Sequence, residues 1–152
     1  MASNANFISQ FVMGGDPCTY KESGELQAEM SKLTHPARPD VDWRQVEKLC
    51  LALFRQNGVE LQTLVCYVLA ITRRQGLAGM ADGLGSLDIL LQRWADFWPV
   101  QVHSRISLLS WVTEKMQQAL RTLDIQYQDL PQIYRCVQHL SAIETTLQQC
   151  EL

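Results

Sequence analysis

The feature that most constrains the fold is the segment of about residues 59–75, which is apolar on nearly every side. Its large apolar side chains do not fall on one stripe of a helix, and they are Leu61, Leu64, Val65, Tyr67, Val68, Leu69 and Ile71. A helix that is hydrophobic all round is stable only when other elements cover several of its faces. The segment therefore predicts a central helix, around which the rest of the chain must pack.

Periodic apolar residues on both sides of this segment predict the helices that cover it. Asp42 is a good N-cap, and Gln45 three residues later can complete a capping box for the helix that precedes the central one. Asn57-Gly58 indicates where that helix ends. Asp129 can cap the last helix, whose first turn tolerates Pro131. The expected helices are 23–33, 42–57, 59–75, 80–97, 102–123 and 129–150.

Glycines follow the central segment and mark the next connection. Gly76 and Gly79 are expected to lie in the turn, while Gly83 and Gly85 are expected to let the following helix approach a neighbour closely. That helix should end before Pro99, because the residue before a proline disfavours helical geometry. A phosphate-binding loop is excluded, since it needs a preceding strand and a Lys that this stretch lacks.

No segment shows bounded period-two alternation, so the fold class is all-α. We expect a compact bundle of about five to seven helices built from antiparallel helical hairpins, with an N-terminal arm over 1–40 and a helical domain over 41–152. The last helix carries a heptad-like stripe, which favours an ordinary amphipathic helix closing the bundle over a coiled coil. The stripe consists of Ile133, Cys136, Leu140, Ile143, Leu147 and Cys150.

Composition and charge limit the kinds of partner and the cellular compartment that we expect for this chain. The net charge is -3 and the basic residues are scattered, which argues against nucleic acid as a partner. The longest apolar run, Leu64–Ile71, is too short to span a bilayer, and the first residues lack the pattern of a signal peptide, so we expect none. The five cysteines include no CxxC pair, and three fall at apolar helical positions, which indicates a reducing cytoplasm.

Ordered motifs then carry a resemblance to a known family. The chain has a D-W-x-x-V start at Asp42, Trp43, Arg44 and Val46, and an R-x-G-L-x-G turn at Arg74, Gly76, Leu77 and Gly79, followed by Gly83, Trp94 and the Trp98-Pro99 pair. Arg105–Val112 and Gly15-Asp16-Pro17 fit the same pattern. Together they resemble the ImpA-type N-terminal domain of TssA-like and VasL-like proteins of bacterial type VI secretion systems.

The resemblance implies a structural role rather than catalysis. TssA-like proteins help assemble or stabilise the contractile tail through baseplate, sheath, inner tube or membrane-complex proteins, so these are the implied partners, with self-association as a further option. The chain would be one domain of a longer protein that works in the cytoplasm or, through the rest of that protein, at the inner membrane. No cofactor or metal is implied. One departure is Glu60-Leu61-Gln62, where relatives often carry Asp-Leu-Arg.

Candidate functional residues have structural explanations as well. Trp98 and Arg73 are the candidates for partner contact, whereas Trp43, Trp94 and Trp111 are expected to fill the core. Of Arg73 and Arg74, at least one should pair with an acidic neighbour such as Asp82 or Glu47.

Two other functional classes remain as alternatives. A TPR-like scaffold would bind a peptide or a partner helix, but no repeat of about 34 residues can be aligned. An enzyme would have to use Cys136 and His139, which share a helical face, yet no third group accompanies them in the sequence. The sequence therefore favours a non-catalytic interaction domain.

Overall fold

The computed structural model describes residues 8–37 and 39–150 and confirms the all-α class. Its helices are α1 (Lys21–Ser31), α2 (Trp43–Gln56), α3 (Leu61–Gln75), α4 (Leu77–Leu91), α5 (Val102–Leu120) and α6 (Leu130–Gln149). Short 3-10 turns lie at Pro17–Thr19, Lys32–Thr34 and Tyr127–Asp129. Extended pairing within the described ranges is confined to an isolated parallel bridge between Met13 and Val59.

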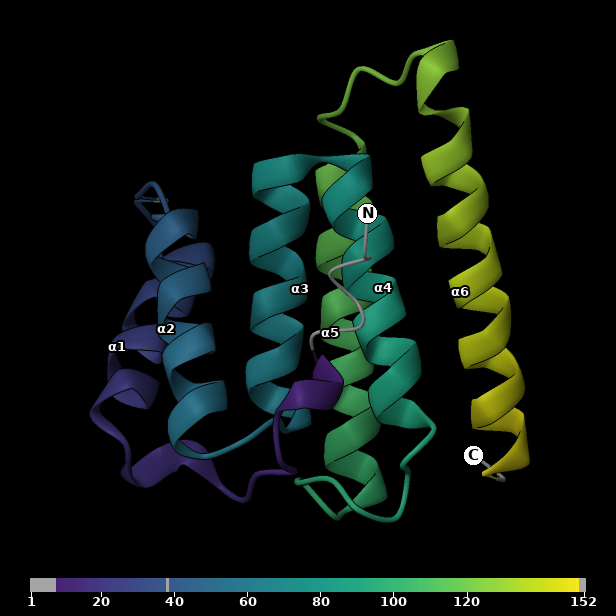
Figure 1. Cartoon of the computed structure of the whole chain (residues 1–152). Coiled ribbons are helices and arrows are strands. Elements are labelled where there is room, and N and C mark those ends of the chain that lie inside the picture. The colour runs from purple at the N-terminus through teal and green to yellow at the C-terminus, as the bar shows by residue number, and fades with distance from the viewer. Residues whose placement is uncertain (1–7, 38, 151–152) are drawn as a thin grey trace.

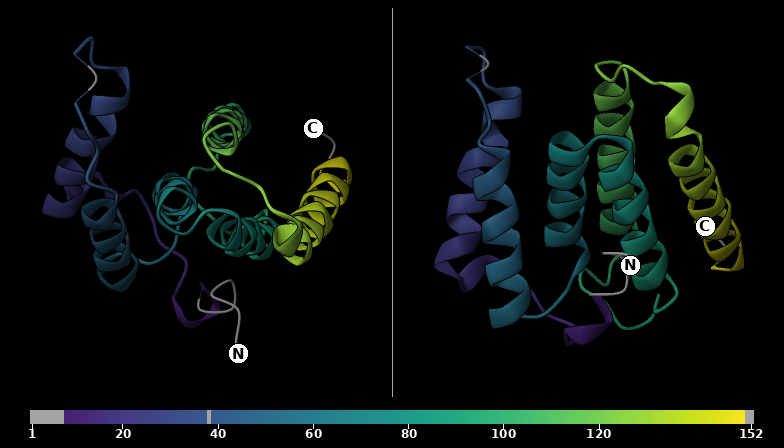
Figure 2. Two further views of the ribbon diagram at one scale, coloured as in Figure 1. Left: turned by 90° about the horizontal axis from the view of Figure 1, so that it is seen from above. Right: turned by 45° about the horizontal axis from the view of Figure 1, so that its top comes forward.

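The helices are arranged in a row with two helices added on one side. Helices α2, α3, α4 and α6 stand next to one another, and α1 and α5 lie on the same side of this row, against α2 and α3 respectively (Figures 1 and 2). The outer members of the row are α2 and α6. Helix α3 therefore contacts α2, α4 and α5 and is the centre of the molecule.

The burial of α3 follows from its apolar surface. Every residue from Thr63 to Thr72 is buried, as is Leu61, so the expected central helix is confirmed. Polar groups in this stretch have partners close by in the sequence, since the Thr72 hydroxyl donates to the Val68 carbonyl at 2.8 Å and the Thr63 backbone N–H donates to Oε1 of Glu60. No helix in the described part of the chain is both long and apolar enough to cross a membrane.

Helices α3 and α4 form a tight hairpin that depends on glycine. The link is the single residue Gly76, whose φ of 67° lies in the left-handed region. Gly79, which we expected in the turn, belongs instead to the first turn of α4, where a Cβ would overlap the Ile71 carbonyl oxygen. Gly83 confirms the predicted close approach, because a Cβ there would lie 2.7 Å from Cγ1 of Val68. The two helix axes can approach this closely only with glycine at both positions.

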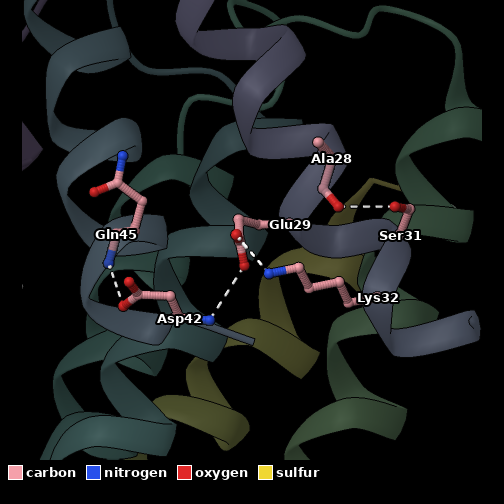
Figure 3. A network of polar contacts seen from close by, with 6 residues as sticks. All are labelled: Ala28, Glu29, Ser31, Lys32, Asp42 and Gln45. Carbon is pink, nitrogen blue, oxygen red and sulfur yellow. Dashed lines mark hydrogen bonds and ion pairs between the residues drawn. The ribbon is translucent and has the colours of Figure 1, made fainter. Parts of the chain in front are cut away.

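The start of α2 confirms half of the predicted capping box. Oδ1 of Asp42 accepts a hydrogen bond of 3.1 Å from the Gln45 backbone N–H. The return bond does not come from Gln45, because the Asp42 backbone N–H donates at 3.1 Å to Oε2 of Glu29 in α1. Glu29 also pairs with Lys32 at 2.8 Å (Figure 3). The cap of α2 is therefore completed by α1, which ties the two helices together.

Several helix ends differ from the sequence expectations. Helix α4 ends at Leu91 rather than near Phe97, and α5 ends at Leu120 rather than Leu123. Asp129 precedes α6 as expected, but its carboxylate accepts from the Gln126 backbone N–H at 2.8 Å instead of capping the helix. The early end of α4 has a specific cause, which is a buried arginine in α5.

Candidate interaction groove

Arg105, near the start of α5, organises the segment between α4 and α5. Its side chain is buried, and its guanidinium donates to three main-chain carbonyls: Nε to Pro99 at 2.5 Å, Nη2 to Phe97 at 2.6 Å, and Nη1 to Trp94. Carbonyls that accept from a charged side chain need no helical partner. The chain after Leu91 therefore leaves the helix and wraps around Arg105, which sequence reasoning missed.

Two aromatic rings enclose the same cation. Cζ of Arg105 lies 3.9 Å from the centroid of the Phe97 ring and 4.6 Å from that of Trp94. The two rings meet edge to face, with centroids 5.6 Å apart. Arginine between aromatic faces gains cation–π attraction in addition to its hydrogen bonds. Trp94 therefore packs against the core, as predicted, and also contacts the buried Arg105 side chain.

This wrapped segment places Trp98 and Pro99 at the start of α3. The Trp98–Pro99 peptide bond is cis, and the Trp98 carbonyl accepts a hydrogen bond of 2.9 Å from the Leu61 backbone N–H. Pro99 is buried, while Trp98 is partly exposed. The Trp98 side chain therefore stands at the edge of a surface that α3 and α5 share.

That surface is a groove, which we call the α1–α3–α5 groove. It consists of two adjoining recesses of about 410 and 640 Å³, which share Gln62, Ser107 and Leu108. The first recess is lined further by α1 and α3 residues and by Trp111 of α5, and the second by Trp98 to Gln101 and by His103 and Ser104. Apolar side chains of the first recess are Met30, Val65, Cys66, Leu108 and Trp111.

The groove is lined without carboxylate, ammonium or guanidinium groups. None of the residues that line it, all of which lie in the described ranges, is an Asp, Glu, Lys or Arg. Its polar lining consists of amides and hydroxyls, such as those of Gln27, Gln62 and Ser107. Amides and hydroxyls both donate and accept hydrogen bonds. The groove is therefore suited to a main chain and apolar side chains rather than to a charged ligand.

Beside the groove, a buried carboxyl caps α3. Oε1 of Glu60 accepts from the Thr63 backbone N–H at 2.9 Å and Oε2 from that of Gln62 at 2.6 Å. The side chain is fully buried, and this burial raises the pKa of Glu60 to about 7, although the two N–H donors act in the opposite direction. At Glu60-Leu61-Gln62, where relatives often carry Asp-Leu-Arg, this chain therefore has an uncharged Gln62 in the lining of the groove.

The two residues named as candidates for partner contact lie on different surfaces. Trp98 lines the groove, whereas Arg73 does not, and Cζ of Arg73 lies 5.8 Å from the Trp43 ring centroid. Its neighbour Arg74 forms the expected ion pair with Glu47. Arg73 and Arg74 therefore lie where α2 meets α3, and of the two candidates Trp98 is the one that lines the groove; a partner contact stays a prediction for both.

The other motif residues occupy structural positions. Asp42 caps α2, Trp43 is its first residue, Arg44 is exposed and Val46 is fully buried. The expected core tryptophans Trp43, Trp94 and Trp111 are each partly buried and pack against the core. The remaining motif positions form the α3–α4 hairpin or the segment around Arg105: Gly76, Leu77, Gly79, Gly83, Trp94 and Pro99.

The thiols in the described residues are mostly buried, and the Cys136–His139 pair is held by other contacts. Cys136 is buried, and burial raises its pKa, which lowers the population of the reactive thiolate. Nδ1 of His139 lies 3.5 Å from Oδ2 of Asp88 on α4. Burial raises the pKa of Cys66 to about 12 and that of Cys50 well above its ordinary value. A search of the described residues finds no cluster of three potential metal ligands.

Comparison with known proteins identifies a family. A family model described as ImpA, N-terminal, type VI secretion system, matches residues 8–114, which is more than half of the chain. The match includes α1 to α4, the segment around Arg105 and the whole groove. No curated protein and no solved structure matches the chain.

Proposed function

We propose that this chain, which belongs to the ImpA N-terminal family of the type VI secretion system, is a non-catalytic interaction module that helps assemble or stabilise the contractile tail. The observation that carries the proposal is the α1–α3–α5 groove, which lies entirely inside the family-matched region. The buried, high-pKa thiols support a binding role over a catalytic one. The module works in the bacterial cytoplasm.

The character of the groove defines the chemistry of its occupant. Its lining is apolar with uncharged hydrogen-bonding groups, and Trp98 stands at its edge. Partly exposed tryptophans are over-represented among residues that dominate binding energy. The occupant is therefore an uncharged, largely apolar segment of another secretion-system protein from the baseplate, sheath, tube or membrane complex.

A substitution in the middle of the groove tests this assignment. Ser107 is exposed and lines both recesses, so Ser107→Arg fills the groove and adds a charge without touching the core. Ser110→Arg is the matched control, because Ser110 is exposed on the same helix but lies outside the groove. Each variant is used to capture purified baseplate, sheath, tube and membrane-complex subunits.

The proposal requires a specific outcome. The wild-type chain and Ser110→Arg should retain one of these subunits, and Ser107→Arg should lose at least about tenfold in affinity, which corresponds to about 1.4 kcal/mol. If well-folded wild-type chain captures none of the subunits, the interaction role is wrong. If both arginine variants bind as wild type, the partner binds elsewhere.

A further inference from the structure

Helix α6 is held to the rest of the molecule by one side only. Its main packing partner is α4, and in Figures 1 and 2 it stands at the end of the helix row. Of its residues Leu130–Gln149, only Cys136 is buried, whereas α3 is buried from Thr63 to Thr72. A helix with so little buried surface opens at a lower free energy than the core helices.

The contact between α6 and α4 is complementary in charge. Nη2 of Arg135 lies 2.6 Å from Oδ1 of Asp82, and Nδ1 of His139 lies 3.5 Å from Oδ2 of Asp88. The two basic residues are four apart and share one edge of α6. In each pair the carboxylate is less exposed than its partner, so the acidic groups belong to the α4 surface and the basic groups come to it from outside.

Apolar side chains beside this edge complete the contact. Cys136 joins the hydrophobic core, and Ile133 and Ile143 pack against it. The recognition pattern is thus an apolar stripe with two basic residues, spaced four apart, along one side. Exposed or half-exposed ion pairs contribute only about 0–1 kcal/mol each, so this pattern gives selectivity without tight attachment.

The two sides of the contact differ in their relation to the family. Asp82 and Asp88 lie within the family-matched residues, whereas α6 lies beyond residue 114, where the match ends. The α4 surface is therefore part of the family domain, and the helix that covers it is not part of the matched region. None of the residues that line the α1–α3–α5 groove belongs to α4, so the two surfaces are independent.

We propose that the α4 surface around Asp82 and Asp88 is a docking site for a helix of a partner protein, and that α6 covers this site until the partner displaces it. The partner helix carries the pattern that α6 displays, which is an apolar stripe flanked by two basic residues four positions apart. Charge complementarity with Asp82 and Asp88 selects it. Displacing α6 uncovers the α4 face against which it packs, and the partner helix covers that face in its place.

A peptide of residues 128–150, with Cys150 replaced by Ser and a fluorescent label, serves as the probe. The receiving protein is the full chain with Arg135→Glu and His139→Glu, which repel α6 from α4 and leave α4 unchanged. We expect the peptide to bind this released chain at least about tenfold more tightly than the wild-type chain, in which α6 competes. Circular dichroism and thermal unfolding verify that the released chain stays folded.

A charge exchange provides the matched control. In the control, Asp82→Arg and Asp88→Arg are made in the chain with native α6, whose own Arg135 and His139 then release it from α4. This chain should not bind the native peptide, and a peptide with both basic residues changed to Glu should bind it instead. Equal binding to wild-type and released chains, or binding that ignores the change at Asp82 and Asp88, would overturn the proposal. So would wild-type dimers that exchange α6, because the occupant would then be a second copy.

Hydrogen exchange of the wild-type chain gives a second test that needs no variant. The α6 amides should exchange at least about tenfold faster than those in the middle of α3, and 0.5 M salt should increase the difference, because it screens the ion pair between Arg135 and Asp82. Exchange of α6 only together with α3 and α4 would contradict a separable α6. These results are independent of the capture experiment on the groove.

Discussion

The guanidinium of Arg105 lies 3.9 Å from the centroid of the Phe97 ring and donates a hydrogen bond of 2.6 Å to the carbonyl of the same residue. One buried cation thus holds both the side chain and the main chain of Phe97. The same group binds the carbonyls of Trp94 and Pro99. The segment that ends α4, presents Trp98 and leads into α5 is therefore organised around Arg105.

Replacing Arg105 should destabilise the fold strongly. Arg105→Met keeps a long apolar side chain but leaves three carbonyls without their charged donor, and each buried, unsatisfied acceptor costs about 1–3 kcal/mol. We expect the free energy of unfolding in urea to fall by about 3 kcal/mol or more. Arg121→Met, at an exposed arginine after the end of the same helix, is the control and should change it by less than about 0.5 kcal/mol. Equal effects of both substitutions would contradict the assigned role of Arg105.

Glu60 predicts a pH dependence of stability with a definite sign. Its pKa is about 7 in the folded chain against 4.5 ordinarily, so between these values the folded state binds more protons than the unfolded state. The contribution of Glu60 therefore favours folding most below pH 4.5, decreases as the pH rises towards 7, and stays constant above it. Integrated over this window, the loss is on the order of 3 kcal/mol.

Glu60→Gln isolates this contribution, because the amide is uncharged at every pH and its oxygen can still cap α3. We expect the variant to gain stability relative to wild type by about 2–3 kcal/mol between pH 5 and pH 8. The measurement is the difference between the urea unfolding free energies of the two chains at each pH, so that other carboxylates cancel. A difference that does not vary with pH would show that Glu60 is ionised normally.

Substitution by alanine should change the stability of the fold in opposite directions at two glycines that lie in helices. Gly79 of α4 has no room for a Cβ, which would overlap the Ile71 carbonyl oxygen, so Gly79→Ala must push the α3–α4 hairpin apart and should destabilise by about 1–3 kcal/mol. Gly24 of α1 has nothing within 4 Å of a Cβ, so Gly24→Ala should stabilise by about 0.5–1 kcal/mol through helix propensity. Thermal unfolding of both variants measures the two changes in stability. A lower stability of Gly24→Ala than of the wild-type chain would contradict this explanation.

The same glycines show what the sequence could and could not predict. Periodicity identified α3 as central because its apolar surface leaves no alternative, and the local signals at Asp42 and Asn57-Gly58 gave both ends of α2. The sequence places Gly79 in the turn because it lies close to Gly76. A glycine that turns the chain and a glycine that lets two helices touch cannot be told apart from the sequence alone. The end of α4 depended on Arg105, fourteen residues beyond Leu91, and such a contact has no local signal.

The sequence predicts one residue of the groove but not its overall character. Trp98 is one of the two residues expected to contact a partner, and it lines the groove. The other, Arg73, lies outside the groove beside Trp43 of α2, and its contact with a partner stays a prediction. The neutral character of the groove comes from α1, α3 and α5 together, and three segments far apart in sequence reveal it only once they are folded.

The five cysteines allow a last prediction, in which reactivity follows burial and reports on α6. Cys18 is exposed, whereas Cys50 of α2 is fully buried against α3 and outside the groove, and burial raises its pKa well above the ordinary value. During a pulse of N-ethylmaleimide at pH 7.5, Cys18 should react first, and Cys50 should react only through global unfolding. Cys136 is also buried, but it lies on α6, whose main packing partner is α4.

If α6 opens separately, Cys136 should react at least about tenfold faster than Cys50, because its exposure needs only the local event. Digestion and mass spectrometry after increasing pulse lengths give the rate at each thiol. Arg135→Glu should raise the rate at Cys136 several-fold and leave that at Cys50 unchanged, because it removes the ion pair to Asp82 without touching the core. Equal rates at Cys136 and Cys50 in both chains would show that α6 opens only when the whole molecule unfolds.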